Sequence, residues 1–259
     1  MRHFSSSFAT GALTIAVFLS ASPAGAVPVD LSDWQVDGGG NWILQSDPEP
    51  NDSVLQTLNS APTVFFNNVD SQGTALSGSI EVQTTSDDDF FGFVLGYNDG
   101  DLFGLNSVTD YIMVDWKQGT QAGWEAGMSI SRVTGSINTC GTCTGTDPWD
   151  HDGNVEFLER AATLGSTGWS DHTSYLFDVV FTSTLIEVFV DDVQQFSISG
   201  AFSNGSFGFY NFSQERVRYA GITEEVVPDV LENPVSVPEP STLALLGLVL
   251  LGLGLRRKR

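Results

Sequence analysis

Strand-like runs recur between the two ends of the chain, and no apolar pattern of helical period persists there. Short runs rich in aromatic and β-branched residues are separated by turn residues, which is typical of strands. The pattern predicts strands at 41–45, 63–67, 77–84, 90–97, 110–118, 127–133, 174–181, 186–190, 194–199, 206–212 and 216–223. So many short strands predict an all-β sandwich or barrel.

The faces of two strands can be assigned, because successive side chains of a strand point to opposite sides. In 90–97 the bulky face holds Phe91, Phe93, Leu95 and Tyr97, and in 110–118 the apolar face holds Ile112, Val114 and Trp116. The expected aromatic core between two antiparallel sheets contains Trp42, Phe65, Phe93, Ile112, Val114, Trp116, Ile130, Phe177, Val179, Val188, Val190, Phe207, Phe209 and Phe212. We therefore predict a two-sheet antiparallel sandwich.

Two local features complete this pattern. The runs 186–190 and 194–199 are joined across Asp191 and Asp192, which predicts a hairpin with the carboxylates in its turn. One helix is expected at the sandwich edge, over 154–164, where Val155, Leu158 and Ala162 would share a side.

Acidic residues dominate the charge of the chain. The formal net charge is −22, with 32 acidic against 10 basic residues. Between the termini the basic residues are Lys117, Arg132, Arg160, Arg216 and Arg218. Such a surface repels a phosphate backbone, so we expect no nucleic-acid partner and favour a cation.

Both ends carry the pattern of a targeting segment. Residues 1–26 predict a secretory signal peptide, with Arg2, an apolar run and an A-x-A cleavage site that ends at Ala26. Pro, Glu, Val and Ser over 228–237 predict a linker. Pro238, Glu239 and Pro240 then precede about 15 mostly apolar residues, fewer than the roughly 17–25 of a helix that spans a membrane. Four positive charges end the chain and favour the cytoplasmic side of a membrane.

The most pointed candidate for chemistry is the run of Asp87, Asp88 and Asp89. Three adjacent like charges repel unless water or a cation screens them, and hard oxygen ligands in a loop suit Ca²⁺. Asp99 and Asp101 form a second candidate, although Asp99-Gly100 is also an ordinary turn signal. For Asp87–Asp89 a solvated acidic loop is the alternative.

Other motifs are incomplete. Asp150, Asp152 and Asn154 alternate like the opening of an EF-hand loop, but glycine comes too early and Ala161 stands where glutamate is required. Cys140 and Cys143 have the spacing of a redox dithiol or half a zinc site; in an oxidising compartment a local disulfide is expected. We find no E-x-D-x-E triplet, G-x-S-x-G, H-E-x-x-H or P-loop, so no catalytic residue is assigned and the chain is predicted not to be an enzyme.

Three segments in one order carry a family resemblance. DDDFFGFVLGYN followed by DYIMVDWKQ, then GWSDHTSY from Gly168, then FGFYNFSQE from Phe207, resemble the C-terminal lectin-like domain of thrombospondins. The resemblance covers most of 30–225. It implies an L-type lectin-like (concanavalin-like) jelly roll and, because that domain belongs to calcium-binding proteins, calcium at Asp87–Asp89. The expected domain spans 27–227.

The end of the chain, 238–259, resembles a PEP-CTERM sorting signal, with its motif, short apolar helix and basic tail. The resemblance implies recognition by an exosortase after export through the secretion machinery, removal of the tail, and release or attachment at the cell surface or extracellular matrix. Membrane contact would be limited to this segment before processing. A plain membrane anchor is the alternative.

These expectations define a first functional hypothesis. The chain would be an exported, non-catalytic, calcium-binding, lectin-like adhesion or matrix module that binds extracellular polysaccharide or a surface protein. A polysaccharide-cleaving enzyme on the same scaffold and a purely structural matrix protein are the alternatives.

Overall fold

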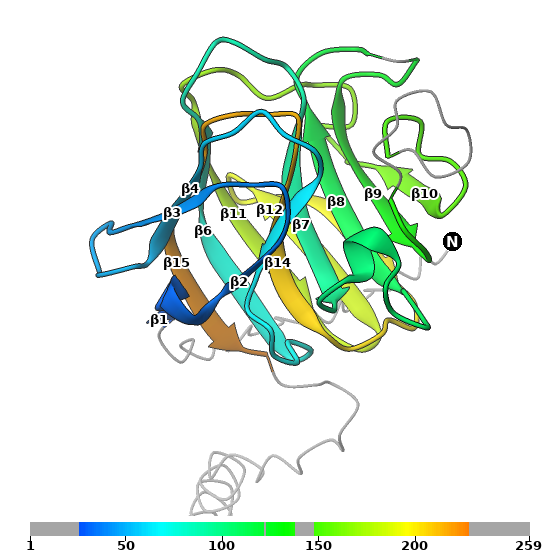
Figure 1. The fold of residues 1–259 in the computed structure, drawn as a ribbon, viewed down its shortest axis with the longest axis horizontal. Helices are drawn as coiled ribbons and strands as arrows, with labels where there is room; N and C mark the ends of the chain where they lie inside the picture. The colour runs from blue at the N-terminus through cyan, green and yellow to red at the C-terminus, as the bar shows by residue number, and fades with distance from the viewer. Residues whose placement is uncertain (1–25, 122, 138–147, 228–259) are drawn as a thin grey trace, which may run out of the picture.

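The strand-like runs build two antiparallel sheets that pack face to face (Figure 1). The structure is a computed structural model, and it describes residues 26–121, 123–137 and 148–227. Within these ranges there are fifteen strands and two 3₁₀ turns, η1 (Leu31–Asp33) and η2 (Asp101–Phe103), and none of the helices is long and apolar enough to cross a membrane. The predicted all-β, two-sheet sandwich is confirmed.

The first sheet has eight strands. Their order is β13 (Val193–Ser199), β12 (Leu185–Val190), β11 (Ser174–Phe181), β6 (Thr74–Val82), β15 (Val217–Val226), β4 (Ser53–Gln56) and β3 (Trp42–Gln45), with β1 (Val27–Pro28) also paired to β15. The second sheet has seven strands, in the order β10 (Val155–Arg160), β9 (Gly127–Val133), β8 (Tyr111–Lys117), β7 (Phe90–Tyr97), β14 (Ser206–Phe212), β5 (Thr63–Phe66) and β2 (Gln35–Gly38).

Aromatic side chains fill the space between the sheets, which we call the inter-sheet core. Phe93 of the seven-stranded sheet meets Phe177 of the eight-stranded sheet at 4.8 Å between ring centroids, and Phe209 stacks on Tyr219 at 4.1 Å. Nearly all of the predicted core residues lie in this layer. Trp42 is only partly buried against it, and Phe212 lies on the opposite face of its sheet.

The outer face of the seven-stranded sheet is also buried. Loop residues Leu102 and Ile137 pack there with strand residues, and Trp149 contacts the same cluster. This outer cluster also contains Val64, Phe66, Phe90, Val94, Tyr97, Tyr111, Met113, Val133, Val155, Tyr210 and Phe212. Every residue of β7 and β8 is therefore buried, because each strand has an apolar layer on both sides.

Tyr97 corrects the predicted face of its strand. Phe91, Phe93 and Leu95 lie in the inter-sheet core as expected, whereas Tyr97 lies in the outer cluster. Gly96 has a φ of 75°, and the register between β14 and β7 shifts at this point. A bulge adds one residue to a strand, so the side chain beyond it changes face.

The predicted helix over 154–164 is wrong, because Val155–Arg160 is strand β10, paired with β9 at the sheet edge. The apolar residues whose spacing suggested a helix instead lie on the two opposite faces of a strand. Val155 lies in the outer cluster and Leu158 packs against the inter-sheet core. Residues three apart on a strand point to opposite sides, so a spacing of three satisfies two apolar layers as well as one helix face.

The predicted hairpin at 186–199 is confirmed as β12 and β13. Asp191 and Asp192 form its turn, with φ values of 49° and 63°. Positive φ at both central residues is the requirement of a two-residue type I′ turn, and aspartate tolerates it better than most residues.

A buried tyrosine hydroxyl helps to link the two sheets through the core. Tyr219 of β15 is fully buried, and its hydroxyl donates to the carbonyl oxygen of Tyr210 at 2.9 Å while lying 3.1 Å from that of Gly92. Both acceptors belong to the seven-stranded sheet. The bond therefore helps to hold the two layers in one alignment.

Tyr219→Phe should lower the free energy of unfolding by about 1–2 kcal/mol, because a buried hydrogen bond is lost without a change of shape. Urea unfolding measures the effect. Tyr175→Phe is the matched control: the Tyr175 hydroxyl accepts from the exposed Ser170 N–H, and its removal should cost less than about 0.5 kcal/mol. Equal effects of the two variants would contradict the inter-sheet role.

Candidate metal centre

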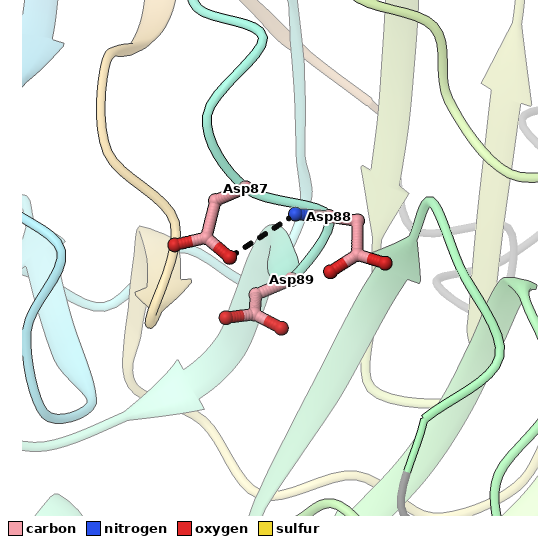
Figure 2. Close-up of side chains that lie close together, drawn as sticks. All are labelled: Asp87, Asp88 and Asp89. Carbon is pink, nitrogen blue, oxygen red and sulfur yellow. Dashed lines mark hydrogen bonds between the residues drawn. The ribbon is translucent and has the colours of Figure 1, made fainter.

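The three consecutive aspartates lie in the loop that leads into β7. One carboxylate oxygen from each of Asp87, Asp88 and Asp89 lies within 4.8 Å of the others, and Figure 2 shows the three carboxyl groups gathered around one space. Oxygens bound to one Ca²⁺ at about 2.3–2.6 Å are at most roughly 5.2 Å apart. The three aspartates thus fit one calcium ion in distance and in ligand type.

The backbone of this loop is held by the segments that carry the family resemblance. The Asp88 carbonyl accepts from the N–H of Gln118 at 3.2 Å, directly after β8. The Asp89 carbonyl accepts from Nε1 of Trp169 at 3.2 Å, and the Asp89 N–H donates to Oε1 of Gln214 at 3.0 Å. Segments far apart in sequence therefore meet at the acidic loop and fix its path.

Amide side chains surround the carboxylates. Asn59 donates to Asp87 and Gln121 donates to Asp88. Ser213 in turn donates to the Asn59 side-chain oxygen at 3.2 Å. Both amides present their nitrogens to the carboxylates, so Asn59 and Gln121 help to orient Asp87 and Asp88. Sequence reasoning missed both, because each lies in a separate loop with no local motif.

Asp89 is the most buried of the three, with 6% of its surface exposed. Burial first, and then the negative charges of Asp87 and Asp88, raise the pKa of its carboxyl group from 3.8 to about 6, although a hydrogen bond from Ser213 lowers it. A bound divalent cation would act in the opposite direction, because it favours the charged carboxylate. Without a cation, the folded protein therefore favours the protonated form of Asp89 at a position where a bound cation would favour its charged form.

Asp99 and Asp101 do not join this cluster. They follow β7, whereas the three aspartates precede it, so a strand of eight residues separates the two places by roughly 25 Å. Asp101 is fully buried, and its oxygens accept from the Asn98 N–H at 2.9 Å and the Asn106 amide at 2.8 Å. These bonds give Asp101 the role of closing a loop. Asp99 is exposed, and calcium at this second place stays a prediction.

A buried polar cluster on the outer face of β8 and β9 was not expected from the sequence. Nδ1 of His151 lies 2.7 Å from the Ser131 hydroxyl, and its Nε2 lies 3.4 Å from Asp115 Oδ1. Trp124 stacks on the imidazole at 4.2 Å. An acid, an imidazole and a hydroxyl thus lie in line, but Ser131 has no exposed surface and offers no access to a substrate.

Lys117 is a buried cation next to this cluster. Its ammonium group donates to the carbonyl oxygen of Gln121 at 3.1 Å and lies over the rings of Phe90 and Trp149. Burial lowers the pKa of Lys117, while the charges of Asp115 and Asp89 oppose that shift. The lysine therefore places one positive charge behind the acidic loop.

Several predicted residues lie outside the described ranges. These are Cys140 and Cys143, with their expected disulfide, and the processing residues Pro238, Glu239 and Pro240. Ala26 is the first described residue and is exposed. In the EF-hand-like segment Asp150 and Asp152 are exposed.

Comparison with known proteins agrees with this architecture. Thrombospondin-2 of Gallus gallus is 28% identical over 204 residues, which cover 71% of this chain and 16% of that protein. Cartilage oligomeric matrix protein of Mus musculus is 25% identical over 221 residues, covering 78% of this chain and 28% of that protein. The chain therefore spans well under half of the length of these relatives.

Solved structures show the fold alone. A carbohydrate-binding module, CBM66, from Bacillus subtilis has a TM-score of 0.50 at 9% identity, covering 74% of this chain and 95% of that one. A Bacillus subtilis protein described as having a galectin-like fold also has a TM-score of 0.50, at 11% identity, and covers 78% and 95%. The architecture is thus that of a lectin-like sandwich.

The family follows from two matches within the chain. Residues 40–226 match the thrombospondin C-terminal region, and residues 236–259 match the PEP-CTERM protein-sorting motif. The chain belongs to the thrombospondin C-terminal family, and both resemblances seen in the sequence are confirmed. The sorting motif marks an exported protein that is anchored in the membrane transiently before processing.

The raised pKa of Asp89 should make stability depend on pH in cation-free buffer. Between pH of about 4 and 6 the unfolded chain loses this proton while the folded chain keeps it, so the free energy of unfolding should fall as pH rises. Asp89→Asn should remove this part of the slope. Urea unfolding between pH 4 and 7.5, with Asp99→Asn as the control, measures it; parallel profiles for wild type and Asp89→Asn would refute the assignment.

Proposed function

We propose that this exported lectin-like chain is a non-catalytic, calcium-binding adhesion or extracellular-matrix module that an exosortase processes. The single observation that carries the calcium part is the gathering of three carboxylate oxygens within 4.8 Å of one another, in a loop fixed by three separate segments. The family match and the sorting motif support the setting in which the module would act.

The ion would have a structural role. Two like charges about 5 Å apart repel by on the order of 3 kcal/mol at the effective dielectric constant of a protein surface. A divalent cation replaces this repulsion by attraction and ties the loop before β7 to its neighbours. Because those neighbours include the loops that carry Asn59 and Gln121, one ion would stabilise a whole end of the sandwich.

Export and processing complete the proposal. Residues 1–26 would be removed as a signal peptide, and recognition of Pro238, Glu239 and Pro240 by an exosortase would release the folded domain from its tail. The product would then reach the cell surface or extracellular matrix. There it would bind a polysaccharide or a surface protein, and the shared fold with a carbohydrate-binding module makes saccharides the first ligand class to test.

A polysaccharide-cleaving activity is the second candidate, and one observation favours it. Asp47 and Asp178 line the same hollow on the eight-stranded sheet. Asp47, however, is bound to Arg218 at 2.8 Å, and a carboxylate held in this way is poorly placed to donate a proton or to attack a sugar. Release of reducing ends from a polysaccharide, lost in Asp178→Asn, would favour this candidate. A purely structural matrix protein is the third.

Calcium should raise the melting temperature of the protein. An ion at 100 times its dissociation constant contributes about 2.7 kcal/mol, which corresponds to roughly 5–10 °C for a domain of this size. Calorimetry with added calcium and with chelator measures the shift. Asp87→Asn should lose most of it, because it removes one ligand charge.

Asp99→Asn is the matched control, since it changes the same charge at the far end of β7. It should keep the full calcium shift. An equal melting temperature of the wild type with calcium and with chelator would overturn the calcium part of the proposal. Loss of the shift in Asp99→Asn alone would place the ion at the other end of the strand.

A further inference from the structure

The outer face of the eight-stranded sheet carries a hollow of about 430 Å³. Its floor is made by small residues of β6 and β15, and its walls include Leu176, Asp178 and Asp47. The side chains of the floor are shorter than those of the walls, so the surface of the sheet is hollowed between the walls. A volume of this size is within the range of small-ligand sites in proteins.

The strand register places four residues side by side, of which Asp178, Ser77 and Thr223 line the hollow and Phe189 lies beside it, paired with Asp178. Phe189 of β12 pairs with Asp178 of β11, Asp178 pairs with Ser77 of β6, and Ser77 pairs with Thr223 of β15. We call these four residues the transverse row. They come from four different strands, so the sheet itself holds their spacing.

All four side chains point away from the core. Val188 and Val190 flank Phe189 in sequence and lie in the inter-sheet core, as do Phe177 and Val179 on either side of Asp178. A side chain added at Gly78 would meet Ile222 and Phe177 of the core, so its neighbour Ser77 points outward. Thr223 likewise follows the buried Ile222. The row thus forms one continuous outward line.

The polar groups of the row have unused hydrogen-bonding capacity. Among the described residues, the Asp178 carboxylate and the hydroxyls of Ser77 and Thr223 have no side-chain partner, whereas Asp47 on the opposite wall is held by Arg218. Gly221, with a φ of 62°, lies in the register shift of β15 between Ala220 and Thr223 and lines the hollow. These groups are ready to bind a ligand.

We propose that the transverse row binds a neutral saccharide, an inference that rests on the proposed polysaccharide-binding function and names its site. The carboxylate accepts hydrogen bonds from sugar hydroxyls, Ser77 and Thr223 both donate and accept, and the partly exposed ring of Phe189 packs against an apolar sugar face. Asp178, Asp47 and a chain charge of −22 disfavour acidic polysaccharides.

The test is isothermal titration calorimetry of the full chain with soluble neutral gluco-, galacto- and manno-oligosaccharides, and with oligolysine as a cationic probe. Asp178→Asn should weaken binding of the preferred oligosaccharide at least about tenfold, since a charge-assisted hydrogen bond is lost. Phe189→Ala should weaken it to a similar degree. Asp192→Asn is the matched control: it removes the same charge from the neighbouring β12–β13 turn, and its φ of 63° suits asparagine.

Each outcome decides the assignment. Loss of binding in Asp178→Asn and Phe189→Ala, with unchanged melting temperatures and a normal Asp192→Asn, supports it. Unchanged affinity in both row variants overturns the site while saccharide binding by the chain stands. Binding of oligolysine instead of any oligosaccharide, lost in Asp178→Asn, would make the hollow a site for cationic peptide and overturn the saccharide assignment. If the wild type binds none of these probes, the row and the polysaccharide part of the proposed function both fail, whereas the calcium shift is measured separately.

Discussion

Aromatic packing between the two sheets is the constraint on which the rest of the structure depends. Phe93 and Phe209 of one sheet contact Phe177 and Tyr219 of the other, and each such buried side chain contributes about 1.5–3 kcal/mol. Because interiors are closely packed, this layer sets the position of β7 and β14. The positions at which the loops leave the ends of these strands are therefore fixed.

The acidic loop shows what that rigidity makes possible. Asp88 and Asp89 are held through their backbones by Gln118, Trp169 and Gln214, so main-chain bonds fix the path of the loop independently of its carboxylates. Three carboxylates can then remain close together despite their repulsion. The raised pKa of Asp89 reflects its burial and this repulsion. The buried Lys117 behind the loop balances only part of the negative charge of the three aspartates.

The two sheets differ in what covers their outer faces. Loops cover the seven-stranded sheet, and polar residues such as Asp115, His151 and Ser131 are enclosed there. The eight-stranded sheet instead presents small and polar side chains around an open hollow. This difference leaves the calcium candidate at a sheet end and the ligand candidate on the opposite sheet, so one ion and one saccharide would not compete for the same surface.

The sequence by itself determined most of the strands, the inter-sheet core and the acidic run, because runs of aromatic and β-branched residues and adjacent carboxylates are local patterns. It missed the short strands β1, β2 and β4. It could not decide between a helix and a strand at Val155, since a spacing of three fits both. The bulge at Gly96, the burial of Lys117 and His151, and the approach of Asn59 and Gln121 to the aspartates were decided only by the tertiary structure. These features depend on which distant segments lie side by side, and the sequence of a single strand does not show which strand it will pair with.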